Sequence, residues 1–164
     1  MKVEIVNYAA GNCHKYGSQI LYRAVKFAEK YDSDCVPEVL WNTITYSLRQ
    51  ENPEMLVLAA IEDGKVAGHL LCRIVNNDGT LIALITQLEI DQKKREDREQ
   101  TMLDGMGLVH NFAKLWGAKR VRCWARNEKV AILFERFGFK PKDYVLMDIG
   151  LEVEDGTEDS GIVD

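Results

Sequence analysis

Three apolar runs separated by two short turn sequences dominate the middle of the chain. Residues 55–61 are apolar without interruption, and residues 66–75 resume this character after Glu62-Asp63-Gly64-Lys65. An Asp-Gly pair supplies the positive φ that a tight hairpin turn requires. A second turn sequence, Asn76-Asn77-Asp78-Gly79, precedes a nearly all-apolar run over residues 80–90, which is predicted to be buried on both faces. The pattern predicts three consecutive antiparallel strands.

One strand and two helices are predicted before this meander. Residues 3–6 form a short β-branched run, which is broken at Gly11 and Asn12. Residues 16–31 then place apolar and charged side chains on different faces at helical spacing. Pro37 suits the first turn of a second helix, whose apolar stripe continues to about residue 51.

Residues 81–117 predict a strand, a highly charged turn and an amphipathic helix. From Met102 onward the apolar residues fall at helical spacing as far as Trp116, and Gly117 is a good helix terminator. A strand that leads into a helix through a turn points free N–H groups and the positive end of the helix dipole into a crevice. Such a crevice can bind an anion such as phosphate, so any chemical site is expected here.

A further strand, helix and strand are predicted in the last third of the chain. Residues 118–126 alternate small apolar side chains with arginines and a tryptophan, and this strand should run parallel to the one before the helix. Residues 127–137 predict a helix that ends at Gly138, and residues 144–151 predict a final strand. Residues 152–164 are acidic and contain glycine, so disorder is expected there.

Length and composition fit one soluble domain over residues 1–151, followed by an acidic tail over 152–164. The 164 residues are 46% apolar and 29% charged, which is enough for a hydrophobic core. The net charge is -5, but the tail holds six acids and no base, so the rest is near +1 (-5 plus 6) and offers no field for nucleic acid or a membrane. Scattered cysteines without a CxxC pair favour a reduced, cytoplasmic setting. No window approaches the ~20 apolar residues of a membrane span.

Two stretches and the order of the elements resemble a known fold. Residues 127–139, NEKVAILFERFGF, match a late-helix pattern written NxxAixLYexxGF, and residues 61–68, IEDGKVAG, match a hairpin with an acidic-Gly-Lys turn. Together with the order β-α-α-β-β-β-α-β-α-β, they resemble the GNAT N-acetyltransferase superfamily. The resemblance covers about residues 1–151 and implies an α/β (α+β) fold with a mixed, mostly antiparallel sheet. It also implies transfer of an acetyl group from acetyl-CoA to an amine.

The resemblance places an acetyl-CoA site where the fourth and fifth strands diverge and leave unpaired backbone groups for the pantetheine arm. It assigns these groups to Leu88 and Ile90, and it places Asn127 near the far end of the arm. The turn that wraps the pyrophosphate should read R/QxxGxG/A, because glycines let the backbone approach the phosphates closely. The candidate cofactor-binding residues implied by the resemblance are Leu88, Ile90, Arg95, Arg98, Gln100, Thr101, Asn127 and Phe134.

The pyrophosphate turn departs from the family pattern. Counting forward from Ile90 places Arg95, Arg98 and Gln100 on the three motif positions, so the glycines are missing. Counting back from the end of the helix shifts the register by two residues and also recovers no glycine, which indicates a turn longer than usual. A third register uses the GxG at Gly105-Met106-Gly107 and leaves about ten residues for the helix.

The missing glycines and the charges of this turn both affect phosphate binding. A non-glycine residue forced to positive φ costs ~1–2 kcal/mol. A carboxylate about 6 Å from a phosphate costs roughly 3 kcal/mol at an effective dielectric of ~20. Three carboxylates between residues 96 and 99 have this effect, whereas four basic residues between 93 and 98 could offset it by contacting the phosphates. Weakened binding is therefore expected, and the alternative is a solvated charge run on an exposed turn.

The acid and the base are the second departure from the family pattern. A tyrosine at the position of Phe134 commonly protonates the departing CoA thiolate, because its pKa near 10 lies close to that of a thiol. Phe134 cannot donate a proton, and loss of a positioned acid costs roughly 10²–10⁴-fold in rate. Thr86 and Gln87 occupy the usual places of a fourth-strand glutamate base. Glu89 is the nearest carboxylate and a weak candidate base, the alternative being an ordinary solvent-facing strand residue.

Histidines and cysteines predict no metal site. His14, His69 and His110 are isolated in sequence and lack metal-ligand spacing, so they are expected to be surface or satisfied core residues. Cys123 lies on the predicted fifth strand, where a core thiol is favoured over a nucleophile.

Two functions are consistent with these features. The first is an N-acetyltransferase-like protein, active in the cytoplasm, that uses acetyl-CoA on an amine of a small molecule or a protein. The alternative is a catalytically inactive GNAT-fold module, either in an oligomeric complex or in a phage particle, because the turn glycines and the tyrosine are missing together. The sequence does not encode the identity of the acceptor or the oligomeric state.

Overall fold

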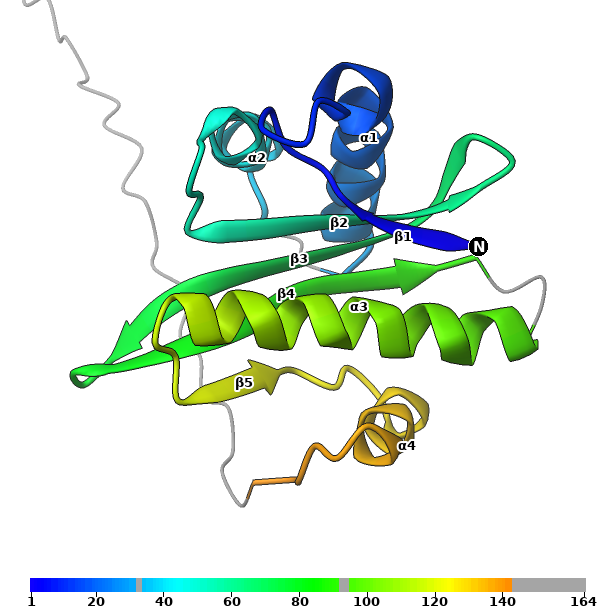
Figure 1. The fold of residues 1–164 in the computed structure, drawn as a ribbon. Helices are drawn as coiled ribbons and strands as arrows, with labels where there is room; N and C mark the ends of the chain where they lie inside the picture. The colour runs from blue at the N-terminus through cyan, green and yellow to red at the C-terminus, as the bar shows by residue number, and fades with distance from the viewer. Residues whose placement is uncertain (32–33, 92–94, 143–164) are drawn as a thin grey trace, which may run out of the picture.

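A five-stranded sheet forms the centre of the molecule (Figure 1). In the computed structural model the described residues are 1–31, 34–91 and 95–142, without the side chains of 95–97. The predicted final strand (144–151), the tail (152–164) and the domain boundary between them lie outside these ranges. The strands are β1 (Lys2–Ile5), β2 (Met55–Glu62), β3 (Lys65–Asn77), β4 (Thr80–Ile90) and β5 (Arg120–Cys123).

The strands lie in the sheet in their sequence order. Strands β1 to β4 pair antiparallel with their neighbours, and β5 runs parallel to β4. Asp63-Gly64 and Asp78-Gly79, at the two hairpin turns, have positive φ angles between 50° and 82°. The predicted meander and its turns are therefore confirmed. The positive φ matters because it matches the twist of the turn to that of the two strands.

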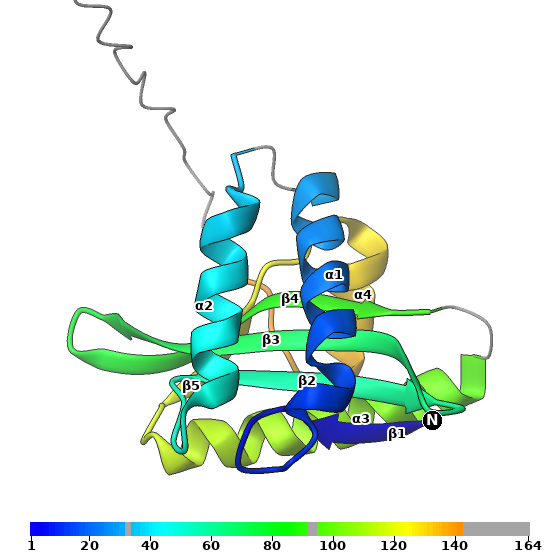
Figure 2. The same cartoon turned by 90° about the horizontal axis from the view of Figure 1, so that it is seen from above.

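Helices cover both faces of the sheet (Figures 1 and 2). Each face has its own apolar cluster, one under α1 and α2 and the other under α3 and α4. None of the helices in the described ranges is long and apolar enough to cross a membrane. The predicted fold class and the element order are confirmed from the first strand to the last helix. The helices are α1 (Cys13–Tyr31), α2 (Pro37–Arg49), α3 (Arg95–Leu115) and α4 (Glu128–Arg136).

Helix α3 begins seven residues before Met102, where the sequence pattern placed its start. The connection from β4 is therefore only residues 91–94, and the longer turn expected from the two counts is wrong. Gly105 and Gly107 lie inside the helix, so the register that used them as a phosphate turn is also wrong. Among the described residues, positive φ at a non-glycine occurs only at Asp63 and Asp78, so the expected strain is absent from the first turns of α3. Arginine, glutamate and glutamine favour helix, which explains the early start.

Gly68 and Gly105 differ in whether the structure has room for a Cβ atom. A Cβ at Gly68 on β3 would lie 2.7 Å from the oxygen of Glu89, a backbone atom that cannot move aside. We expect Gly68→Ala to lower the free energy of unfolding by about 1–3 kcal/mol through overpacking. Gly105→Ala should instead raise it by about 0.5–1 kcal/mol, because the new Cβ would meet only Leu58 Cδ1 at 3.9 Å and alanine favours helix. Urea unfolding measures both changes, and a destabilised Gly105→Ala variant would contradict the helical assignment.

Candidate functional site

Strands β4 and β5 pair only over a short distance and then separate. The paired residues run from Ile82 with Arg120 to Ile85 with Cys123. Strand β5 ends at Cys123, whereas β4 continues to Ile90. In the part of the chain that the structure describes, residues 86–90 have no strand partner on the β5 side. The predicted strand over 118–126 is therefore too long at both ends.

A β-bulge bends β4 at the point where the two strands separate. Leu71 pairs with Gln87 and Cys72 pairs with Ile85, so Thr86 is the extra residue between them. The Thr86 hydroxyl donates to the backbone oxygen of Leu71 at 3.3 Å. A bulge bends its strand and increases the local twist, so β4 changes course next to Ile85, the last residue that pairs with β5.

Arg126 holds the chain after β5 against the end of α1. Its guanidinium donates to the backbone oxygen of Tyr31 at 2.9 Å. The same group lies 5.1 Å from the ring centroid of Phe27 and 5.0 Å from that of Tyr31, which are cation–π distances. Trp124, two residues before Arg126, is 51% exposed. The bulge lies in β4, on one side of the gap, and the Arg126 contact lies in the chain after β5, on the other side.

The backbone groups of Leu88 and Ile90 point into this gap. Asp91 donates its N–H to the backbone oxygen of Ala67 on β3 at 2.8 Å. In an antiparallel pair, successive residues direct their N–H and C=O groups to opposite sides of the strand. Asp91 and Glu89 therefore face β3, whereas Leu88 and Ile90 face the open side. Their side chains are half-buried against the α3 cluster.

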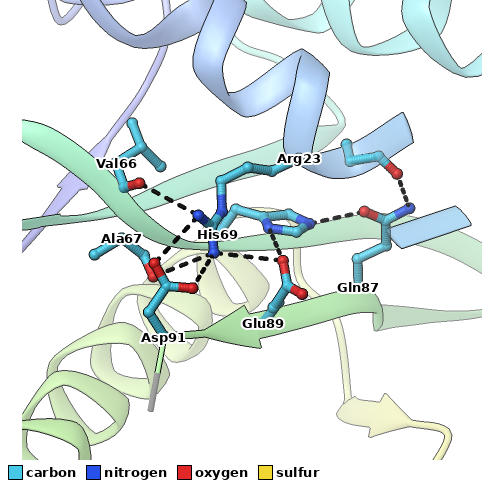
Figure 3. Close-up of polar contacts among 8 residues, drawn as sticks. Arg23, Val66, Ala67, His69, Gln87, Glu89 and Asp91 are labelled. Carbon is cyan, nitrogen blue, oxygen red and sulfur yellow. Dashed lines mark hydrogen bonds and ion pairs between the residues drawn. The ribbon is translucent and has the colours of Figure 1, made fainter. Parts of the chain in front are cut away.

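His69 on β3 is buried on the α1 side of the sheet, and its hydrogen bonds select one tautomer (Figure 3). Its Nε2 lies 2.9 Å from Gln87 Oε1, while Gln87 Nε2 donates to the backbone oxygen of Ala24 at 3.2 Å. Gln87 Oε1 must therefore accept, so the proton is on His69 Nε2. Burial lowers the pKa of His69 to about 4; the Gln87 hydrogen bond opposes this shift and the Arg23 charge adds to it. The ring is neutral at pH 7.

Arg23 on α1 ties together the ends of β3 and β4 (Figure 3). Its guanidinium donates to the backbone oxygens of Val66 and Ala67 at 3.4 and 3.3 Å. The same group contacts the carboxylates of Asp91 at 2.8 Å and Glu89 at 3.4 Å. The Arg23 side chain is only 18% exposed, so removal of both carboxylates would leave a shielded charge without a counter-ion. These contacts fix the part of β4 that carries Leu88 and Ile90.

Glu89 lies between this arginine and the neutral histidine. Its Oε2 is 3.8 Å from His69 Nδ1, which has no hydrogen-bond partner among the described residues. Both atoms are acceptors, so a ligand N–H or O–H would suit the space between them. The carboxylate is 38% exposed and paired to Arg23. Glu89 is therefore accessible on the α1 side, but it is an ion-paired carboxylate.

The other predicted cofactor residues lie on α3 and α4. Arg98 is half-buried and Thr101 is buried, both in the first two turns of α3. Gln100 donates to Asp104 Oδ1 at 2.8 Å and is exposed. Asn127 caps α4, because its Oδ1 accepts from the Val130 N–H at 3.0 Å. Arg95 starts α3, and its side chain is not among those described.

Phe134 and Cys123 belong to the apolar cluster beneath α3. Phe134 is only 4% exposed and packs edge to face on Phe139, with ring centroids 5.0 Å apart. Burial raises the pKa of the Cys123 thiol to about 11, so it is a poor nucleophile at pH 7. Among the described residues, no group of three or more His, Cys, Asp or Glu side chains could hold a metal ion.

Sequence reasoning did not identify His69, Arg23 or Arg126 as parts of the site. Arg23 and Asp91 are 68 residues apart, and Arg126 and Tyr31 are 95 apart, so no local pattern links them. A signal existed only for His69. Once the hairpin register is known, His69 lies opposite Glu89 on β4, and Gln87 lies two residues before Glu89 on the same strand.

The fold is that of known acetyltransferases, although the sequence gives no such match. No protein-family model matches the chain, and no curated protein matches it in sequence. A probable acetyltransferase has a TM-score of 0.67 at 16% identity, over 94% of this chain and 100% of that chain. An aminoglycoside N-acetyltransferase in complex with CoA has a TM-score of 0.62 at 11% identity, over 91% and 93%. Glucosamine-6-phosphate N-acetyltransferase from Arabidopsis thaliana has a TM-score of 0.61 at 12% identity, over 93% and 100%.

These structures define the class of protein by its architecture. The chain has the GNAT fold, and the resemblance that the two sequence stretches indicated is confirmed at this level. Sequence identities of 10–16% are too low to assign the substrates of these proteins to this chain, so the comparisons show the fold alone.

Proposed function

We propose that this protein binds acetyl-CoA in the gap between β4 and β5 and transfers the acetyl group to an amine. The observation that carries the proposal is the separation of the two strands after Ile85 and Cys123. It leaves the backbone groups of Leu88 and Ile90 free to pair with the amides of a pantetheine arm. The complex of a similarly folded aminoglycoside acetyltransferase with CoA supports this choice of ligand.

The proposed reaction needs few groups from the protein. A neutral amine attacks the thioester carbonyl carbon, the C–N bond forms, the C–S bond breaks, and the thiolate takes a proton from water. Glu89 is the carboxylate that could accept the amine proton, because it is accessible on the α1 side. Its ion pair with Arg23 and the absence of a tyrosine at position 134 both argue for slow turnover.

Calorimetry with acetyl-CoA tests the binding step. We expect saturable heat and a rise in the melting temperature at about millimolar ligand, because binding to the native state alone stabilises it. Desulfo-CoA, which keeps the pantetheine arm but lacks the thiol, should bind comparably. Absence of both heat and thermal shift would remove the proposal.

A matched pair of variants tests whether the backbone of Leu88 takes part. Leu88→Pro removes the N–H that points into the gap, whereas Leu88→Ala removes the same side chain and keeps the N–H. We expect Leu88→Pro to bind acetyl-CoA about tenfold more weakly than Leu88→Ala, since one hydrogen bond contributes about 1.4 kcal/mol. Equal affinities of the two variants would show that the ligand does not use this group.

A second candidate function is a GNAT-fold module that binds partners or CoA without acetyl transfer. It is favoured by Phe134, because the position used for a proton donor in the family pattern holds a buried packing residue. Release of the CoA thiol from acetyl-CoA, measured with a panel of amines, distinguishes the acetyltransferase from the module. Turnover above the rate without protein supports the enzyme. Binding without turnover supports the module.

A further inference from the structure

His69 on β3 uses only one of its two ring nitrogens in a hydrogen bond. Nε2 donates to Gln87 Oε1 at 2.9 Å, and Gln87 Nε2 donates to the backbone oxygen of Ala24 at 3.2 Å. Nδ1 therefore carries a lone pair, and it has no hydrogen-bond partner among the described residues. The side chain is fully shielded from solvent. A buried acceptor without a donor costs stability, so the position of this atom needs a physical reason.

Glu89 on β4 is the group that Nδ1 faces (Figure 3). Its Oε2 lies 3.8 Å from Nδ1, which is beyond hydrogen-bond distance, and an ionised carboxylate has no proton to donate. A proton on Oε2 would make Glu89 a donor that faces a free acceptor. The Glu89 side chain is 38% exposed, so it can rotate by the ~1 Å that an O–H···N hydrogen bond requires. Nδ1 and a protonated Glu89 are therefore complementary.

Arg23 on α1 keeps a counter-ion when Glu89 is neutral. Its guanidinium lies 2.8 Å from Asp91 Oδ1 and 3.4 Å from Glu89 Oε2, so Asp91 is the closer carboxylate. Arg23 Nε has no hydrogen-bond partner in the described part of the chain, so it does not supply the donor that Nδ1 lacks. Glu89 can therefore gain a proton without leaving the shielded arginine unpaired.

We infer that His69 is a positioning residue for the proposed acetyl transfer: its Nδ1 accepts a hydrogen bond from Glu89 once Glu89 has taken a proton from the acceptor amine. In this step one N–H bond of the ammonium breaks and an Oε2–H bond forms on Glu89. The amine is left neutral and free to attack the thioester, and the proton passes from Glu89 to water after the product leaves. His69 gains no proton and touches no substrate. The inference rests on the proposed function, in which Glu89 is the base.

Two properties of the His69 ring suit this role. The Gln87 hydrogen bond keeps the ring proton on Nε2, whereas in the other tautomer an Nδ1–H would bind the ionised carboxylate and oppose proton transfer to it. Burial also lowers the pKa of His69 to about 4, so the ring is neutral and its lone pair is available at pH 7. Phe27 on α1 packs edge to face on the ring, with centroids 5.8 Å apart. The Gln87 bond and the Phe27 contact therefore hold the ring with Nδ1 toward Glu89.

Nuclear magnetic resonance of the ring nitrogens tests the geometry without acetyl-CoA. Glu89→Gln mimics the protonated acid, because its amide N–H can donate where the O–H of Glu89 would. We expect Nδ1 to be unprotonated in the wild type and its resonance to move to lower frequency in Glu89→Gln, because Nδ1 then accepts a hydrogen bond. Asp91→Asn is the control, since it removes an equal charge from Arg23 and should leave this resonance in place. A protonated Nδ1 in the wild type, no shift in Glu89→Gln, or the same shift in Asp91→Asn would overturn the inference.

A matched pair of variants tests the effect on turnover, with acetyl-CoA and the amine of the panel that reacts fastest. His69→Asn can place its side-chain oxygen where Nδ1 lies, whereas His69→Gln can still donate to Gln87 but leaves no acceptor beside Glu89. We expect His69→Gln to lower kcat about tenfold with KM for the amine unchanged, and His69→Asn to keep at least about threefold more of the turnover. Melting temperatures report that both variants are folded.

The order of the two variants separates positioning from packing. Both substitutions remove the ring, but only His69→Gln retains the buried hydrogen bond to Gln87, so a purely structural role predicts that His69→Gln is the more active variant. That order, or equal kcat values, would overturn the role of His69 while the proposed function stands. Absence of turnover by the wild type would instead overturn the acetyl transfer itself, and the role of His69 with it.

Discussion

Replacement of Phe134 by alanine should lower the free energy of unfolding by about 3–5 kcal/mol. The side chain is 4% exposed and packs on Phe139 within the cluster beneath α3. Its removal would leave a cavity next to β5, whose pairing with β4 covers only four residues on each strand. Denaturant unfolding followed by circular dichroism measures the change.

Ile132 provides the control for this prediction. It lies on the same helix, α4, but is 47% exposed, so Ile132→Ala should cost less than about 1 kcal/mol. If Phe134→Ala cost no more than Ile132→Ala, Phe134 would not be a core residue. A large loss would support the view that the ring is kept for packing, at a position where the family pattern has a tyrosine.

The second large effect is a loss of stability in mild acid that depends on His69. Burial holds the pKa of His69 at about 4 in the folded protein, against an ordinary value of 6.5. Between these values the unfolded chain binds a proton that the folded protein does not bind, so stability falls as the pH falls. Above about pH 6.5 the histidine is neutral in both the folded and the unfolded chain, so it does not change the free energy of unfolding. The full loss, about 3 kcal/mol, is reached near pH 4.

The measurement compares unfolding free energies at pH 7 and pH 4.5 for the wild type and His69→Gln. The variant should lose less stability over this interval, because the carboxylates titrate in both proteins and only the histidine differs. His110→Gln is the control, since it makes the same substitution at an exposed histidine on α3. Parallel curves for the wild type and His69→Gln would show that His69 is not buried as a neutral ring.

Local sequence patterns were sufficient for most of the elements. Strand β4 has the predicted bounds, Thr80–Ile90, because a turn sequence precedes this nearly all-apolar run and a highly charged segment follows it. The start of α3 was placed too late, because the pattern of apolar residues begins at Met102. Residues 95–101 are helical but contain no apolar side chain, so this part of the helix carries no apolar period.

Much less of the candidate site was visible in the sequence. Leu88 and Ile90 could be named from the resemblance, because alternation along a strand is a local property. The roles of Arg23 and Arg126 could not be predicted from the sequence, because their partners lie 43 to 95 residues away. Phe134 was named for its place in a motif, whereas its burial depends on the packing of α4 against the sheet.

The sequence by itself determined the element types, the hairpin turns and the fold class, because hydrophobic periodicity and glycine conformations act over a few residues. It also determined that the turn glycines and the tyrosine of the family pattern are missing. Only the tertiary structure decided that β4 and β5 separate after four pairs, that His69 is neutral in one tautomer, and that Glu89 is paired to Arg23. These features depend on burial and on contacts between distant segments, which exist only when the sheet and its helices are packed together.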